Sequence, residues 1–82
     1  MDVATAFGKV LRRTRLHLAL TQETLALNAE LQRNYVSLME RGKHEPTLST
    51  IIALSEALGC SPVHLVSEVM SELSNQNSSC SQ

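Results

Sequence analysis

Apolar residues recur at steps of three and four along most of this chain, the spacing that places side chains on one face of a helix. The first such run predicts an amphipathic helix over residues 2–18. Its predicted inner face consists of Val3, Phe7, Val10, Leu11, Thr14 and Leu18. Lys9, Arg12 and Arg13 fall outside that face and are expected to meet solvent.

Two shorter helices are predicted next. The first opens after Thr21, whose hydroxyl can accept a free backbone N–H, and closes at Ala29. The second covers residues 32–41, with Gly42 suited to the position just past its end. Their inner faces consist of Leu25, Ala26, Ala29, Val36 and Met39. Two short helices around a three- to four-residue turn form a helix-turn-helix, whose second helix can enter a DNA major groove.

Two further helices complete the pattern. Pro46 interrupts the chain, and Thr47 can cap a fourth helix that ends at Gly59. Ser61 and Pro62 suit the cap and first position of a fifth helix. The apolar positions are Leu48, Ile51, Ile52, Leu54 and Leu58 in the fourth helix, and Val63, Leu65, Val66, Val69, Met70 and Leu73 in the fifth. The sequence thus predicts an all-α, five-helix domain over residues 1–73 and a flexible polar tail over 74–82.

Composition agrees with a small helical core. Hydrophobic residues make up 43% of the 82 residues, with one Phe, one Tyr and no Trp. The β-branched and aromatic runs of strands are missing. A domain of this size buries only about 60–65% of its unfolded surface, so association with a second copy would stabilise it.

Charge is divided unevenly along the chain. The net charge of −1 argues weakly against nucleic acid as a partner. However, residues 1–43 hold all seven Lys and Arg residues and carry +3, whereas residues 44–82 carry −4. This division indicates that one part of the molecule meets phosphate and another part does not.

Several functional classes find no support in the sequence. No His, Cys or acidic residues have metal-ligand spacing, and no Ser/His/Asp set suggests catalysis, so we expect no metal, no cofactor and no enzyme. Cys60 and Cys80 do not form a disulfide framework. Neither a transmembrane run nor a signal peptide is evident, which predicts a cytoplasmic protein without a membrane partner. No small-molecule site is evident either.

The stretch LTQETLALNAELQRNYVSLMERG at residues 20–42, followed by P-T-L at 46–48 and A-L-G at 57–59, resembles the Cro/repressor-type (XRE-like) helix-turn-helix family. The similarity runs from about Phe7 to Leu65. It implies a compact, lambda-repressor-like DNA-binding domain that acts as a dimer. Short family members include phage Cro-like regulators and the controller proteins of restriction-modification systems, and the run at residues 33–37 is similar to the latter.

The chain departs from the family at two turn positions. Ala19 and Glu30 stand where members usually carry glycine. The turn position, occupied here by Glu30, commonly has positive φ, which costs a residue with a side chain roughly 1 kcal/mol or more. We therefore expect the turn to be mildly strained or reshaped, with the fold intact.

Base contacts are expected from the third helix. The resemblance places Arg33, Asn34 and Leu38 at positions that face bases, with Gln32 at the helix start. Their chemistry fits, because Arg can pair with guanine, Asn with adenine, and Leu can meet a thymine methyl. Ser37, one turn after Arg33, can bond a base or a phosphate. The alternative is that these residues only line a solvated face.

Phosphate contacts are expected from residues flanking these helices: Gln22, Tyr35, Arg41, Lys43 and His44. Gln22 opens the second helix, where free N–H groups attract anions, and the family uses this position against the DNA backbone. The alternatives are a solvent-facing Gln22, a partly buried core Tyr35, and an ordinary basic loop after the third helix. The resemblance also implies a partly buried ion pair between Arg15 and Glu40 that orients the recognition helix.

The fifth helix is too apolar for a helix packed on one side. We expect Val63, Val66, Val69, Met70 and Leu73 to form a homodimer interface. Such a dimer would place two recognition helices about 34 Å apart, on a palindromic operator. The alternative is that this face folds back onto the core. The leading functional prediction is therefore a homodimeric regulator that binds double-stranded DNA in a sequence-specific way; the alternative is an antitoxin that also binds a partner protein.

Overall fold

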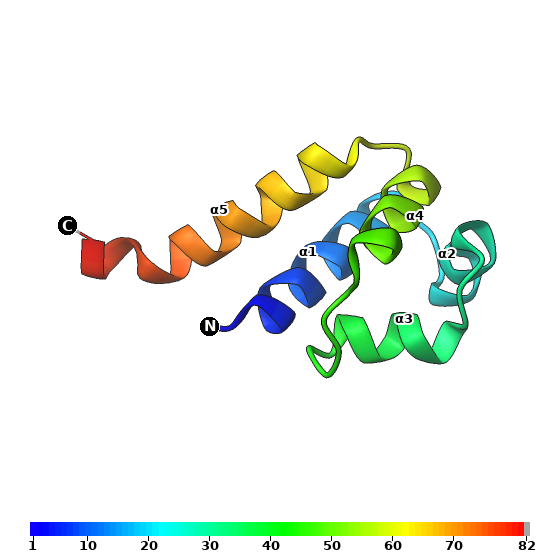
Figure 1. Cartoon of the computed structure of the whole chain (residues 1–82), viewed down its shortest axis with the longest axis horizontal. Helices are drawn as coiled ribbons and strands as arrows, with labels where there is room; N and C mark the ends of the chain where they lie inside the picture. Colours follow the sequence, from blue (N-terminus) through cyan, green and yellow to red (C-terminus); the bar gives the residue numbers. More distant parts are fainter. Residues whose placement is uncertain (82) are drawn as a thin grey trace.

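The computed structural model describes the backbone of residues 1–81 and the side chains of residues 1–75. These residues form five helices and no strands. The helices are α1 (Val3–His17), α2 (Gln22–Ala29), α3 (Arg33–Glu40), α4 (Leu48–Leu58) and α5 (Pro62–Ser81). The predicted all-α class is confirmed. Figure 1 shows α5 lying alongside α1, with α2 and α3 together around the turn.

Helix boundaries follow from local chemistry. The hydroxyls of Thr21, Thr47 and Ser61 each accept a backbone N–H three residues later, at 3.0 to 3.1 Å. Gly59 ends α4 in a left-handed conformation, with φ of 75°. These caps are the ones predicted from the sequence. Gln32 precedes α3 without a side-chain cap, so that helix start depends on packing instead.

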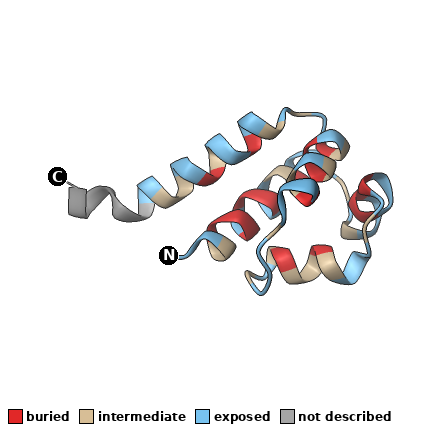
Figure 2. Ribbon diagram, viewed as in Figure 1, coloured by how far each residue is buried: buried red, intermediate tan, exposed pale blue. Residues whose placement is uncertain are grey.

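A single apolar core joins the five helices, as the red segments of Figure 2 show. Leu11 from α1, Leu25 from α2, Met39 from α3, Leu54 from α4 and Leu65 from α5 are all fully or almost fully buried. Each of these residues lies on an inner face expected from the sequence. The core therefore fixes α2 and α3 against a scaffold made of α1, α4 and α5.

Four residues expected on inner faces are exposed instead: Val3, Leu18, Leu48 and Ile52. Val3 and Leu18 lie at the two ends of α1, where few neighbours are available to cover them. Leu48 is the first residue of α4 and is 71% exposed. The apolar residues of α4 thus occupy a wider face of the helix than the other helices cover.

The face of α5 is also divided differently from the prediction. Val69 is only 7% exposed and belongs to the core, and Leu73 packs against that core. The prediction that Val69 faces a partner is therefore wrong. For Leu73, which is only partly buried, it stays a prediction. The reason is that α5 packs against both α1 and α4, so its inner face extends beyond Leu65. Val63, Val66 and Met70 remain exposed.

The backbone of α5 continues to Ser81, beyond the helix end expected near Leu73. The flexible tail was predicted over residues 74–82. Gln82 and the side chains after Asn75 lie outside the described residues. The division into a domain and a flexible tail stays a prediction. None of the described helices is alone long and apolar enough to span a bilayer; only α4 with Pro62–Asn75 reaches that measure, across a bend of 105°.

Candidate nucleic-acid interface

The turn between α2 and α3 contains Glu30, at the position where family members usually carry glycine. Glu30 has φ of 59°, and the backbone N–H of Leu31 donates to the carbonyl of Ala26 at 2.8 Å. Ala19, after α1, has φ of 57°. Both residues therefore carry a side chain in the left-handed region that favours glycine. The positive φ expected at Glu30 is present, and the positive φ of Ala19 was not predicted.

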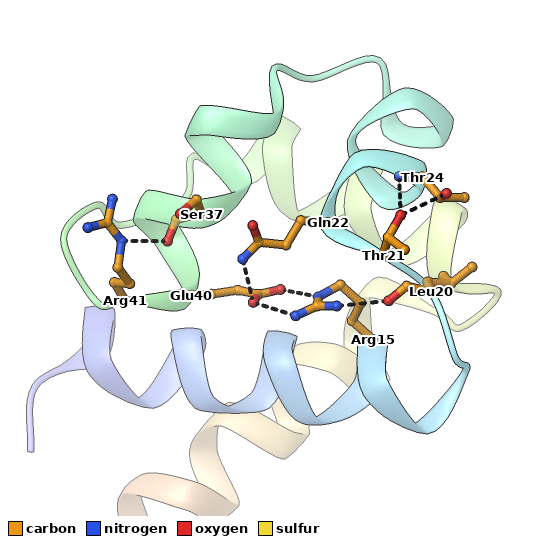
Figure 3. A network of polar contacts seen from close by, with 8 residues as sticks. All are labelled: Arg15, Leu20, Thr21, Gln22, Thr24, Ser37, Glu40 and Arg41. Carbon is orange, nitrogen blue, oxygen red and sulfur yellow. Dashed lines mark hydrogen bonds and ion pairs between the residues drawn. The ribbon is translucent and has the colours of Figure 1, made fainter.

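Arg15 and Glu40 form the predicted pair between α1 and the end of α3 (Figure 3). The Arg15 Nε donates to Glu40 Oε2 at 2.6 Å, and Nη2 donates to Oε1 at 3.0 Å. A third N–H, on Nη1, donates to the carbonyl of Leu20 at 2.8 Å. The side chains are 10% and 3% exposed, respectively. Hydrogen bonding to Glu40 raises the pKa of Arg15, so the guanidinium stays charged at physiological pH.

Gln22 joins the same network. Its Nε2 donates to Glu40 Oε1 at 3.0 Å, the oxygen that also accepts from Arg15 (Figure 3). The side chain is partly exposed and borders an open groove that Arg15 and Arg33 also line. Gln22 is therefore fixed by its neighbours, unlike the free first-turn residue that the sequence allowed. The bond to Glu40 was not predicted from the sequence.

The outward face of α3 carries the residues expected to read bases. Gln32, Arg33 and Asn34 are exposed at its first turn, and Ser37 and Leu38 are partly exposed. The opposite face is fully buried through Val36 and Met39. The structure therefore brings all five candidate residues onto one short accessible helix segment. Base contact by these residues stays a prediction.

The residues expected to contact phosphate have different surroundings. Arg41, Lys43 and His44 are exposed just after α3, and Arg41 Nε donates to the carbonyl of Ser37 at 3.4 Å. Tyr35 is partly buried: its hydroxyl lies 3.5 Å from Thr50 Oγ1, and its ring meets His44 edge-on at 6.0 Å. Packing against the core favours the structural alternative for Tyr35.

Arg13 was expected to be solvated or to add to the positive field. Its side chain is 53% exposed, as expected, and it also pairs with α5, with Nη1 3.0 Å from Glu72 and Nη2 3.6 Å from Glu68. Part of the acidic half of the chain therefore neutralises part of the basic half. The four-residue spacing of the two glutamates is the signal that placed both carboxylates on one helix face.

No group of three or more His, Cys, Asp or Glu side chains within the described part of the chain is placed to hold a metal ion. Cys60 is partly buried against the core as a free thiol. Burial raises its pKa, which disfavours the reactive thiolate. Cys60 thus has the surroundings of a core residue, while the side chain of Cys80 lies outside the described residues.

A model of a helix-turn-helix family matches residues 11–65 of the chain. The chain belongs to this helix-turn-helix family. It is similar to the uncharacterized HTH-type transcriptional regulator y4dJ of Sinorhizobium fredii, at 38% identity over 66 residues, which cover 80% of this chain and 86% of that protein. It is also similar to control protein C.BamHI of Bacillus amyloliquefaciens, at 36% identity, with 79% and 82% covered.

Two solved structures of restriction-modification controller proteins are also similar to this chain. The restriction-modification controller protein C.AhdI from Aeromonas hydrophila has a TM-score of 0.73 and 40% identity, covering 76% of this chain and 94% of that one. The controller protein C.Esp1396I, solved as a tetramer with its natural 35-base-pair operator, has a TM-score of 0.80 and 26% identity, covering 88% and 95%. The family predicted from the sequence is confirmed.

Proposed function

We propose that this protein is a transcriptional regulator that binds double-stranded DNA in a sequence-specific way, as a homodimer on a palindromic operator. The observation that carries the proposal is the division of α3. Val36 and Met39 are buried, while Arg33 and Asn34 project at the accessible first turn. The N-terminal residues of a recognition helix are the ones that reach base edges.

Base recognition is assigned first to Arg33 and Asn34. Arginine donates two hydrogen bonds to guanine O6 and N7, and asparagine pairs with adenine N6 and N7. Gln32 precedes them at the cap position, and Ser37 and Leu38 lie one turn further along the same helix. The partial burial of these last two limits them to a base or phosphate that comes close to the helix.

Backbone contacts surround this reader. Arg41, Lys43 and His44 follow α3 and are exposed. Gln22 lies at the start of α2, where free N–H groups and the helix dipole favour an anion. Tyr35 takes a secondary place, because its hydroxyl is already near Thr50. Such contacts hold the protein on the duplex and carry no sequence information.

Dimerisation is assigned to a surface made by α4 and α5, called here the apolar surface: Leu48, Ile51, Val63, Val66 and Met70. Val63 is 79% and Met70 60% exposed. Exposed apolar side chains that adjoin one another usually mark an interface. The relative C.Esp1396I was solved as a tetramer on its operator, which supports assembly on DNA for this chain too.

The regulator fits the relatives better than the antitoxin alternative does. The relatives are named as transcriptional regulators, control proteins and a repressor. Their names also favour a binding protein over an enzyme. A cytoplasmic location and the absence of a small-molecule effector remain predictions from the sequence.

The test is selection of bound duplexes from a random-sequence pool, followed by affinity measurements over a salt series. Wild-type protein should enrich a two-fold symmetric sequence. Arg33→Ala should weaken binding by about 1–3 kcal/mol and relax preference at one base pair per half-site. Lys43→Ala is the matched control for charge: it should weaken all duplexes alike and lower the salt slope by about one per site. Unchanged sequence preference in Arg33→Ala would show that another residue reads the base.

A further inference from the structure

We propose that Glu40 is a positioning residue for DNA binding, because it holds the Gln22 amide in place to donate to a phosphate. This inference rests on the proposed function. It adds a second role to a carboxylate whose pairing with Arg15 is otherwise only structural. The link runs from α1 through the last residue of α3 to the first residue of α2 (Figure 3).

The hydrogen-bond chemistry fixes which end of the amide faces Glu40. A carboxylate only accepts hydrogen bonds, so it must meet the NH2 group of Gln22 and not the carbonyl oxygen. Glu40 Oε1 accepts from Gln22 Nε2 and from Arg15 Nη2, both at 3.0 Å. Arg15 also takes Oε2, so the carboxylate cannot turn away without losing a bond. The amide is therefore held by a group that is itself held at both oxygens.

One N–H of Gln22 remains for a ligand. The amide nitrogen has two hydrogens, and among the described residues Glu40 is its acceptor. Gln22 is partly exposed, and it borders an open groove together with Arg33 at the start of α3. A phosphate in this groove would meet the free N–H of Gln22 and lie beside the exposed Arg33, one of the proposed base-reading residues. The geometry thus joins backbone binding to base reading.

Fixing the amide before DNA arrives has an energetic consequence. A glutamine side chain loses rotamer freedom when it binds, and that loss lowers affinity. Here the loss occurs during folding, because Glu40 already orders the amide. Arg15 meanwhile neutralises Glu40, so the carboxylate can hold a phosphate-binding group without repelling the phosphate. Both charged side chains of the pair therefore support the contact between Gln22 and a phosphate.

A double-mutant cycle tests this role, using the highest-affinity duplex recovered from the random pool. Gln22→Met removes the amide and keeps the length of the side chain; it should weaken binding roughly ten-fold, as expected for a hydrogen bond to a charged group. Glu40→Gln should also weaken binding in the wild-type background. The fold-change in affinity that Glu40→Gln causes should be at least three times smaller in the Gln22→Met background, because the two substitutions remove the same contact.

The control must lie outside the network of Arg15, Glu40 and Gln22. Arg15 itself holds Glu40, so the variant that controls for weaker binding is Lys43→Ala, which removes an exposed cation outside this network. The fold-change in affinity that Lys43→Ala causes should be the same with Gln22 or Met at position 22. An equal factor for Glu40→Gln in both backgrounds would overturn the proposal and leave Glu40 as a fold residue. Failure of the wild-type protein to bind any duplex would instead overturn the proposed function, and this inference with it.

A measurement on the wild-type fold keeps the test open if Glu40→Gln does not fold. The side-chain amide signals of Gln22 in ¹⁵N-labelled protein can be assigned by their loss in Gln22→Met. They should exchange slowly with solvent, and the bound duplex should shift them. Asn28, an exposed residue of α2 to which no DNA contact is assigned, is the internal control. The proposal would be contradicted if the Gln22 amide signals exchanged as fast as those of Asn28, or if the bound duplex left them unshifted.

Discussion

Ala19 and Glu30 are the residues at which this chain departs from its family, and both have a left-handed backbone. Their φ values of 57° and 59° lie in the left-handed region. A residue with a Cβ costs about 1–2 kcal/mol there, and glycine costs little. The sequence marked both residues as departures from the family, but it predicted a positive φ only for Glu30 in the turn. Whether the turn would bend or stay strained depended on packing, which a pattern of residue types does not contain.

Replacing Ala19 with glycine should therefore stabilise the protein. Relief of the left-handed backbone outweighs the added flexibility of glycine in the unfolded chain, for a net gain of about 0.5–1 kcal/mol. In a domain of this size that corresponds to a rise of a few degrees in the melting temperature, measurable by circular dichroism. The same change within α4, Ala57→Gly, is the control and should destabilise by about 1 kcal/mol. A lower melting temperature for Ala19→Gly would refute the strain.

At the scale of helices, the close approach of α1 to the end of α3 sets the position of the recognition helix. Gly8 lies in the middle of α1, and a methyl group there would lie 2.8 Å from the carbonyl oxygen of Glu40 and nearer still to that of Met39. The ion pair from Arg15 to Glu40 crosses the same junction. A glycine within an amphipathic helix was visible in the sequence, and such a residue signals close backbone contact. Its partner helix was not visible.

Gly8→Ala should accordingly destabilise the fold, although alanine favours a helix by about 1 kcal/mol over glycine. The new methyl group meets backbone oxygens, which cannot rotate away, and overpacking of this kind costs typically 1–3 kcal/mol. We expect a net loss of stability in urea unfolding and weaker DNA binding through the shifted α3. Lys9→Ala, at the exposed neighbouring position, should stay within about 0.5 kcal/mol of wild type. A Gly8→Ala variant as stable as wild type would show that the helices can separate freely.

At the scale of the whole molecule, the pattern of apolar residues predicted the helices, most of the caps and the core, because each depends on local sequence. It did not predict which apolar residues stay outside. Val69 was expected at an interface and is buried, whereas Leu48 was expected in the core and is exposed. Both outcomes depend on how α4 and α5 cross, which no single helix determines. The same limit applies to the hydrogen bond from Gln22 to Glu40, because it depends on how two helices pack and on which rotamer the Gln22 side chain adopts.

The apolar surface leads to a prediction about assembly. Wild-type protein, with a chain mass of 9.0 kDa, should sediment as a dimer at micromolar concentration. Val63→Glu with Met70→Glu should yield a folded monomer, because both side chains are exposed and contribute little to the core. Leu27→Glu, which places one such charge at a residue 76% exposed on α2, is the control and should remain dimeric. DNA affinity should fall for the double variant alone, since a monomer contacts one half-site and loses the effective concentration that links the two. A wild-type monomer at this concentration, or a dimer that survives both charges, would place the interface elsewhere or remove it.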